Sequence, residues 1–383
     1  MKIAILTQPL HTNYGGILQS YALQTFLQKR GHEVIVVNRD YNNPITIKIL
    51  LLRLGSVIKS VIRLVLLRKK EYVVMNPFSP FFHALWTGYN VLPFVENYIN
   101  HSKEIRTSKA LKDYFMKNNF DCYIVGSDQV WRPCYSPGIT DFFLKEVPEG
   151  SKALKLAYSV SFGTDKWEFS DLETKECSTL AKQFNSISVR EKSGIQLCEK
   201  YLGVRAEHVL DPTMLLEAED YIRLFEEDKA QKSKGNLFCY MLDANRELES
   251  IVSYLQTKGF ISVNVTISAL PTKDNDRPYQ MSVEEWLRGI YEAEFIVTDS
   301  FHACVFSIIF KKPFVVLGNK ERGNARFDSL LEMFGLQHRR IESSTLFMSA
   351  FDNLKHNCDL VAAQSLLSNY RAISMAFFER QNV

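Results

Sequence analysis

A histidine at the start of an apolar helix is the first candidate for chemistry in this chain. The segment 295–298 reads Phe-Ile-Val-Thr and predicts a buried strand, Asp299-Ser300 follows as a polar turn, and His302 stands in the first turn of an almost wholly apolar helix. In open α/β folds, ligands bind beyond the carboxyl ends of strands, where helix N-termini attract anions. An imidazole there can meet an anionic substrate and exchange a proton with it. The structural alternative is that His302 only caps or packs at the helix start.

Two further polar clusters follow predicted strands and suit the recognition of hydroxyl groups. The loop 7–16 contains Asn13, Gly15 and Gly16 and leads into a helix. Its glycines let the backbone approach a ligand closely, although a plain tight turn explains them equally well. The segment 126–131 places Asp128 and Gln129 directly after another strand, where a capped turn is the alternative.

Cations follow two other predicted strands. Arg190 ends an apolar strand, and a guanidinium there can bind a carboxylate or phosphate through two parallel hydrogen bonds. Its alternative is a structural salt bridge to Glu191 or Glu207. The loop after the strand 313–317 carries Lys320, Arg322 and Arg326, which together predict an anion site or an ordinary exposed loop.

The elements that position these residues alternate between strand and helix along the whole chain. Apolar strand patterns occur at 2–7, 33–38, 121–126, 154–161, 186–190 and 207–210, and again at 236–242, 260–267, 295–298 and 313–317. Helical patterns separate them, and three more close the chain at 327–334, 345–354 and 359–380. Short βα units predict parallel sheets with right-handed crossovers. The expected fold class is therefore α/β, with two Rossmann-like, doubly wound domains that face a cleft.

The expected domains are an N-terminal one over 1–210, a C-terminal one over 211–345, and terminal helices over 346–383 that pack back on the first. A length of 383 residues is long for a single core. The boundary is expected near Asp211-Pro212, where a strand ends in a turn. An insertion over 45–75 interrupts the first domain.

Composition excludes several classes of function. The formal charge of +3 is too small to indicate a nucleic-acid partner. The seven cysteines are scattered with no Cys-x-x-Cys pair, which predicts reduced thiols in a cytoplasmic protein rather than disulfides or a zinc site. The eight histidines show no metal-binding spacing, so no metal and no cofactor are expected. The first residues predict a strand rather than a signal peptide.

The insertion differs from the rest of the chain because residues 42–70 contain no acidic residue, yet seven lysines and arginines lie among many leucines and isoleucines. The charges recur too often for the roughly 20 apolar residues that a membrane span needs. One interpretation is a pair of amphipathic helices that cover the sheet or bridge the domains. The other is a peripheral contact of 45–70 with the inner face of an anionic membrane.

Taken together and in order, these motifs resemble the polysaccharide pyruvyltransferase family. The resemblance extends over residues 1–340 and is carried by five segments: Asn13–Leu23, Gly126–Trp131, Ser188–Glu191, Asp211-Pro212 and Thr298–His302. It implies a fold similar to the GT-B glycosyltransferases, phosphoenolpyruvate as donor, and a glycan as acceptor. The implied product is a pyruvate ketal across two sugar hydroxyls of a surface polysaccharide, and the acceptor could be linked to a lipid.

The resemblance also implies roles for individual residues. His302 matches the family's proposed catalytic histidine and Arg190 a donor-binding arginine. Many members have an arginine where this chain has Ser300, which we expect at the donor in its place. We also expect a cation of the neighbouring loop to supply the missing charge, Arg326 before Lys320 or Arg322.

From their positions in the loops, the residues expected at the acceptor are Asn13, Gly15, Gly16, Asp128 and Gln129. Two other functions remain open at this point. The first is a GT-B glycosyltransferase that uses a nucleotide sugar. The second is a glycan-binding subunit without catalysis, which the serine at position 300 would explain.

Overall fold

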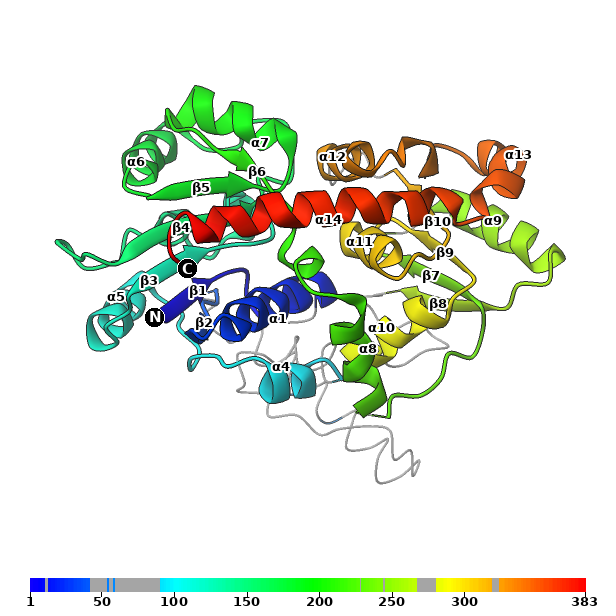
Figure 1. Cartoon of the computed structure of the whole chain (residues 1–383), viewed down its shortest axis with the longest axis horizontal. Coiled ribbons are helices and arrows are strands. Elements are labelled where there is room, and N and C mark those ends of the chain that lie inside the picture. Colours follow the sequence, from blue (N-terminus) through cyan, green and yellow to red (C-terminus); the bar gives the residue numbers. More distant parts are fainter. Residues whose placement is uncertain are drawn as a thin grey trace.

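Two α/β domains, each built on one parallel sheet, make up the described part of the chain (Figure 1). The computed structural model describes residues 1–10, 13–41, 54, 58, 90–227, 229–243, 245–266, 280–318 and 324–383. The N-terminal sheet has six strands and the C-terminal sheet has five. The predicted fold class is confirmed.

The N-terminal sheet has the strand order β2-β1-β3-β4-β5-β6. Its strands are β1 (Lys2–Leu6), β2 (Glu33–Val37), β3 (Cys122–Val125), β4 (Leu154–Val160), β5 (Ser186–Val189) and β6 (Glu207–His208). Every neighbouring pair is parallel. Because the order reverses between β1 and β3, the loops after these two strands diverge and leave the space where doubly wound sheets bind ligands.

The C-terminal sheet repeats this topology with the order β11-β10-β9-β7-β8. Its strands are β7 (Leu237–Met241), β8 (Ser262–Thr266), β9 (Phe295–Thr298), β10 (Phe314–Leu317) and β11 (Arg340–Ile341). The order reverses between β7 and β9, so the loop that leads to His302 lies at the second reversal point.

Helices connect the strands of both sheets. In the first domain they are α1 (Tyr14–Lys29), α4 (Leu92–Tyr98), α5 (Ser108–Lys117), α6 (Asp171–Ala181) and α7 (Lys192–Leu197), with short helical turns at Pro133–Tyr135, Ile139–Phe143 and Cys198–Leu202. After the turn η4 (Pro212–Met214) come α8 (Ala218–Glu227), α9 (Arg246–Thr257), α10 (Val283–Glu292), α11 (Phe301–Ile309), α12 (Ala325–Phe334), η5 (Gln337–Arg339), α13 (Ser344–Leu354) and α14 (Cys358–Glu379).

Local chemistry fixes where the helices near the site begin. Asn13 accepts a hydrogen bond from the Gly15 amide and starts α1. Ser282 and Glu285 form a reciprocal capping box at the start of α10. Ser300 accepts from the Ala303 amide and starts α11. Each side chain satisfies amide groups that the first helical turn leaves without partners.

One hydrophobic core joins the two domains. In β1, Ile3 and Ile5 face this shared core, whereas Ala4 and Leu6 face a second cluster on the other side of the sheet. The same core receives Phe238 from β7, so one face of each sheet contributes to it. Side chains that alternate along a strand lie on opposite faces, which explains why these strands read as continuous apolar runs.

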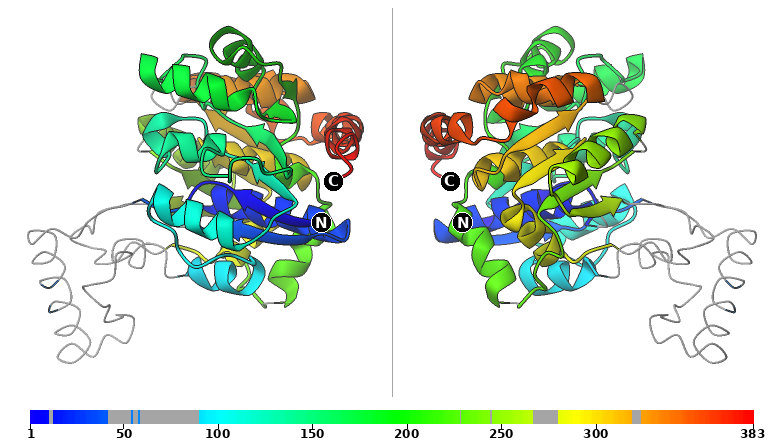
Figure 2. Two further views of the ribbon diagram at one scale, coloured as in Figure 1. Left: turned by 90° about the vertical axis from the view of Figure 1, so that its left-hand side faces the viewer. Right: turned by 90° about the vertical axis from the view of Figure 1, so that its right-hand side faces the viewer.

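Helix α14 crosses the junction between the domains and lies along both of them (Figures 1 and 2). Its Ser374 hydroxyl accepts from the Leu210 amide at 3.0 Å. Arg371 donates to the carbonyls of Met214 and Leu216. The end of the chain therefore helps to hold the segment that connects the two sheets.

The insertion predicted over 45–75 lies outside the described residues, apart from positions 54 and 58. Of the helices that the structure does describe, none has both the length and the apolar character that crossing a membrane requires.

Candidate active site

His302 and Arg190, which the sequence places in different domains, meet at one carboxylate. The Nε2 atom of His302, in the first turn of α11, lies 3.6 Å from Oδ2 of Asp211. Nη1 of Arg190, directly after β5, donates to the same oxygen at 3.0 Å. All three side chains are buried. The two residues with the most specific predicted roles therefore share one site at the domain junction.

Asp211 is fixed by its own turn as well as by these cations. Its Oδ1 accepts from the Thr213 amide at 3.0 Å and from the Thr213 hydroxyl at 2.7 Å. The Ser127 hydroxyl lies 3.2 Å from Oδ2. Burial alone would raise the pKa of Asp211, but His302, Arg190 and the Thr213 donors outweigh burial and hold that pKa well below its ordinary value. The carboxylate is thus kept ionised.

Arg190 is held on both sides by acids. Nη2 donates to Oδ1 of Asp128 at 3.2 Å, opposite the contact with Asp211. The guanidinium also lies over the ring of Phe301, 4.4 Å from its centroid. Burial would lower the pKa of Arg190, and the neighbouring carboxylates, Asp128 first, raise it instead. Its positive charge is therefore largely balanced before any ligand enters.

The start of α1 is pressed against His302. Tyr14 stacks on Trp286 of α10 with ring centroids 5.1 Å apart, and its hydroxyl donates to the Met281 carbonyl at 2.7 Å. The next residue, Gly15, lies so close to the imidazole that a Cβ atom built on it would be 1.9 Å from Nδ1 of His302. Only glycine fits between the helix backbone and the ring.

Side-chain hydrogen bonds tie the loops at both reversal points. Gln19 of α1 donates to the Thr7 hydroxyl at 2.7 Å and accepts from the Ser127 amide at 2.8 Å, which joins the loops after β1 and β3. In the second sheet, Asp299 accepts from the amides of the two residues that follow β7, at 2.6 and 3.1 Å. These bonds fix the backbone that carries Asp128 and His302.

Arg326 is a second buried arginine of the site, and its pKa is lowered. It is only 8% exposed, and its Nε atom has no hydrogen-bond partner. Burial, and after it the positive charge of Arg190, lower the pKa of Arg326 to about 10, against the attraction of Asp128 and Glu191. Within the described ranges no side chain forms an ion pair with it, and Nε is the guanidinium atom that is buried without a partner there.

Glu191 lies buried beside these arginines. Its Oε1 accepts from the Ser161 hydroxyl and from the amides of Phe162 and Gly163, at 3.1, 2.7 and 3.1 Å, while Oε2 has no partner. Burial raises the pKa of Glu191, and Arg190 is the main influence that opposes it. Burial thus favours the neutral form of Glu191 more than it would for an ordinary glutamate.

The remaining candidates lie around this centre. Asn13 is exposed but its side chain already caps α1. Gly16 adjoins Oδ2 of Asp128, which a Cβ on Gly16 would approach to 3.5 Å. Gln129 is half-buried, and its Oε1 accepts from Arg132 at 3.2 Å. The hydroxyl of Ser300 caps α11, and the predicted donor-binding residues Lys320 and Arg322 lie outside the described residues.

Sequence reasoning missed Asp211 and Glu191 as members of the site. From the sequence, Asp211 is expected only as part of a family motif and as the boundary between the domains. A signal was present, because it is a polar residue directly after a strand, like Asp128 and Arg190. Glu191 is expected from the sequence only as a salt-bridge partner of Arg190.

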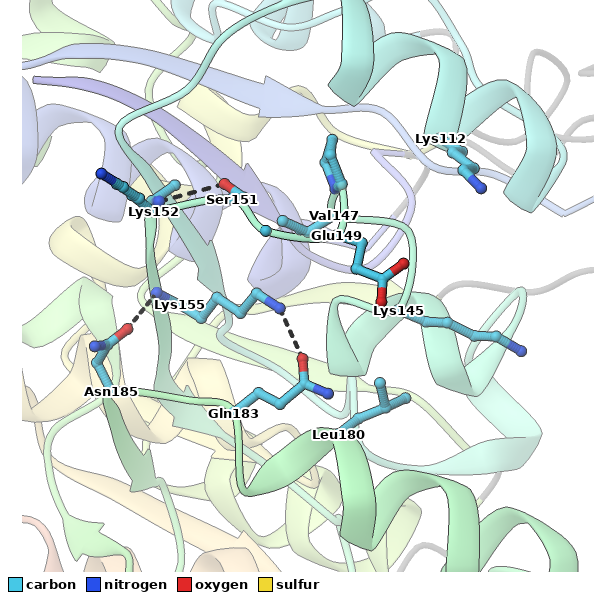
Figure 3. A pocket seen from close by; sticks show the side chains of 13 residues that line it. Lys112, Lys145, Val147, Glu149, Ser151, Lys152, Lys155, Leu180, Gln183 and Asn185 are labelled. Carbon is cyan, nitrogen blue, oxygen red and sulfur yellow. Dashed lines mark hydrogen bonds between the residues drawn. The ribbon is translucent and has the colours of Figure 1, made fainter.

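The described residues also enclose a cavity of about 630 Å³ at the opposite, amino edge of the N-terminal sheet (Figure 3). Lys112, Lys145, Lys152 and Lys155 line it together with Glu149. Lys145 pairs with Glu176, and Lys155 donates to Gln183. Figure 3 shows that the lysine side chains do not converge on one point, so the cavity offers no centred anion site. No group of acidic, histidine or cysteine side chains in the described ranges could hold a metal ion.

Comparison with known proteins identifies the family. The family model for polysaccharide pyruvyl transferase matches residues 13–321, which include every residue of this site except Arg326. The chain belongs to this family. No curated protein matches its sequence significantly.

Solved structures of low sequence identity share the fold of this pyruvyl transferase family member. One is an α-glucosyltransferase in complex with UDP and a 13-mer DNA, with 11% identity, a TM-score of 0.50, and coverage of 100% of this chain and 98% of that one. Another is the UDP-GlcNAc 2-epimerase of Neisseria meningitidis bound to UDP-GlcNAc, with 11% identity, a TM-score of 0.50, and coverage of 99% and 100%. These similarities establish a GT-B-like arrangement of two domains.

Proposed function

We propose that this protein transfers pyruvate from phosphoenolpyruvate to two hydroxyls of a glycan sugar and so forms a pyruvate ketal in surface polysaccharide biosynthesis. The observation that carries the proposal is the buried guanidinium of Arg326, whose Nε has no partner and which lies in the field of Arg190. Two cations so close to each other repel unless an anion enters between or beside them. The family is named for pyruvyl transfer to polysaccharides, which supports the proposed reaction. The pair of Arg190 and Arg326 supports an anionic donor.

The donor carries a carboxylate and a phosphate, so its site needs several donors of hydrogen bonds. Arg190 already balances two carboxylates, and therefore Arg326 is the better candidate to bind the incoming charge. The N-termini of α1 and α11 add amide groups and partial positive charge. Arg326 thus takes the place of the arginine that this chain lacks at Ser300, and Lys320 remains a further candidate.

His302 is the proposed general acid and base. It gives a proton to the methylene carbon of the donor, and the electron pair of the double bond forms the new C–H bond. The first sugar hydroxyl adds to the carbon that bears the phosphate and returns its proton to the imidazole. The C–O bond to phosphate then breaks, the second hydroxyl adds, and its proton leaves with the phosphate. General acid–base catalysis of this kind contributes about 10²- to 10⁴-fold to the rate.

The acceptor is proposed to lie along the loops after β1 and β3. Asn13 is exposed and Gln129 is half-buried, so their remaining hydrogen-bonding groups can reach a sugar hydroxyl. Gly15 and Gly16 let the acceptor approach the helix backbone closely. Asp128 faces Gly16 and can accept from a hydroxyl with the oxygen that Arg190 does not use.

Thermal-shift titration tests the choice of donor. Stabilisation by phosphoenolpyruvate supports the proposal, and stabilisation by a nucleotide sugar or nucleoside diphosphate would support the glycosyltransferase alternative instead. The variant Arg326→Met keeps the aliphatic stem but removes the charge, and it should weaken phosphoenolpyruvate binding about 10- to 100-fold. Arg205→Met, at an exposed arginine, is the matched control. Equal affinities in the two variants would contradict the role of Arg326.

Phosphate release from phosphoenolpyruvate tests catalysis. A panel of glycans with neighbouring free hydroxyls serves as acceptors, and release above the rate without acceptor is expected for at least one of them. A chain that binds the donor but releases no phosphate with any acceptor would fit the non-catalytic alternative. We propose that the assay needs no metal and no added cofactor.

A lipid-linked acceptor would bring the protein to the inner face of the membrane. We propose that the basic segment 45–70, which lies outside the described residues apart from positions 54 and 58, makes that peripheral contact through its lysines and arginines. Sedimentation with vesicles that contain phosphatidylglycerol should carry the protein down, and replacement of these cations by glutamine should abolish the effect. Equal sedimentation of both proteins would refute the contact.

A further inference from the structure

The two nitrogens of His302 have different surroundings. Nε2 is buried and faces Oδ2 of Asp211 at 3.6 Å, with no closer partner. Nδ1 lies on the side of α1, where the Gly15 Cβ position would be 1.9 Å from Nδ1 but 2.4 and 2.5 Å from the adjacent ring carbons. These three distances place Gly15 against the face of the ring. The edge of the ring at Nδ1 is therefore not blocked by this contact.

Asp211 can only accept a hydrogen bond from His302. The carboxylate is ionised, because His302 itself, Arg190 and the Thr213 donors outweigh burial and hold its pKa well below the ordinary value. Its Oδ1 is occupied by Thr213, so Oδ2 is the oxygen that faces the imidazole. A neutral imidazole has one N–H group and one lone pair, and a fixed carboxylate beside one nitrogen decides which nitrogen carries the proton.

We propose that Asp211 holds a proton of His302 on Nε2, so that Nδ1 is the nitrogen that exchanges a proton with the substrate. Asp211 is then a positioning residue, which acts through His302 and Arg190 without touching the substrate. The inference rests on the proposed function for the identity of the substrate, but not for the tautomer. In the transfer, doubly protonated His302 gives its Nδ1 proton to the donor's methylene carbon and keeps the Nε2 proton on the side of Asp211.

The proposal agrees with the other contacts of the ring. Nδ1 forms no hydrogen bond with any residue that the structure describes, as a nitrogen reserved for substrate requires. The ring face at Nδ1 lies against the first turn of α1, and the loop that leads into this turn carries the predicted acceptor residue Asn13. Asp211 also holds Arg190, so a single carboxylate aligns the imidazole of one domain with the guanidinium of the other.

Nitrogen-15 NMR of histidine-labelled protein tests the tautomer directly. The signals of His302 are assigned by their loss in His302→Gln, since the chain has seven other histidines. At a pH where His302 is neutral, we expect the proton on Nε2. A proton on Nδ1 in the wild-type protein would overturn the proposal, whether or not any variant folds.

Asp211→Asn provides the second measurement. An amide can accept from Thr213 with its oxygen and donate toward His302 with its nitrogen, so the neutral tautomer should change to Nδ1–H. Asp128→Asn is the matched control, because it removes the same charge from beside Arg190, whereas among the described residues the carboxylate that pairs with His302 is that of Asp211. In Asp128→Asn, the neutral tautomer of His302 should remain Nε2–H. A change in the control, or none in Asp211→Asn, would refute the positioning role.

Turnover separates this inference from the proposed function. Asp211→Asn should lower kcat by about 10²- to 10⁴-fold, as expected when a catalytic histidine holds the wrong tautomer. If phosphoenolpyruvate is turned over but wild-type His302 carries its proton on Nδ1, only the inference fails. If the tautomer is as expected and no pyruvyl transfer occurs, only the proposed function fails.

Discussion

Substitution of Gly15 by alanine tests how closely α1 controls His302. Gly15 is buried in the first turn of α1, and the added Cβ would lie 1.9 Å from Nδ1 of His302. Ordinary van der Waals contact begins at 3.4 Å, so the ring has to move by about 1.5 Å, the difference between these two distances. Tyr14 prevents the helix from yielding instead, because it stacks on Trp286 and bonds to the backbone of the C-terminal domain.

The expected effect is much larger on turnover than on stability. A misplacement of about 1 Å costs on the order of 10²-fold in rate, so kcat for Gly15→Ala should fall by about 10²-fold or more. Overpacking costs about 1–3 kcal/mol of unfolding free energy. The higher helix propensity of alanine returns up to about 1 kcal/mol. The variant should therefore stay folded while it loses activity.

Phosphate release from phosphoenolpyruvate with a glycan acceptor measures kcat, and urea unfolding measures stability. Gly16→Ala is the comparison, since its Cβ would meet Oδ2 of Asp128 at an ordinary 3.5 Å. The loss in kcat for Gly16→Ala should be at least tenfold smaller. If both variants lose activity equally, or if Gly15→Ala stays near wild-type activity, the contact between α1 and His302 does not control catalysis.

Three further substitutions test the buried polar groups. Arg326→Met should leave the melting temperature at pH 7 unchanged or higher: burial lowers the pKa of Arg326 to about 10, so its charge destabilises the fold below pH 10, and this penalty fades as pH rises from 10 toward the ordinary arginine value. A lower melting temperature would contradict this. Burial raises the pKa of Glu191, so any stability from this carboxyl is present below its ordinary 4.5 and is lost as pH rises through the higher folded value. In urea unfolding, Glu191→Gln should therefore have the same free energy of unfolding as wild type at pH 4 and an equal or higher one at pH 7. A lower free energy of unfolding at pH 7 alone would show that the pKa of Glu191 is not raised. Ser374→Ala leaves the Leu210 amide unpaired and should cost about 1–3 kcal/mol in the same assay, whereas no loss would mean that α14 does not secure the domain junction.

The strands and most helices could be predicted because both faces of each parallel sheet are buried. The runs 33–37 and 295–298 are apolar at nearly every position, as strands covered on both sides require. The sequence also places polar residues after buried strands, at Asp128, Arg190 and His302. The carboxyl ends of parallel strands share one edge of a sheet, which predicts that Asp128 and Arg190 lie near each other. His302 follows a strand of the other sheet, so its contact with Asp211 depends on how the two domains pack.

The state of each site residue could not be predicted in this way. Arg190 and Arg326 are the same residue type, yet two carboxylates balance the first, and no carboxylate among the described residues pairs with the second. Ser300 stands where many members of the family have an arginine, and its hydroxyl is used to cap α11. These differences arise from contacts between segments that are remote in the chain. The local sequence around each residue does not specify such contacts.

The sequence by itself determined the two parallel sheets, the family, and the places where polar side chains leave the strands, because these depend on local composition and on the order of motifs. Only the tertiary structure decided that Asp211 lies between His302 and Arg190 and that Gly15 touches the imidazole. The physical reason is that the charge and orientation of a buried group depend on what the fold places within a few ångströms of it. That arrangement is set by the packing of α1, α11 and α14 around the shared core.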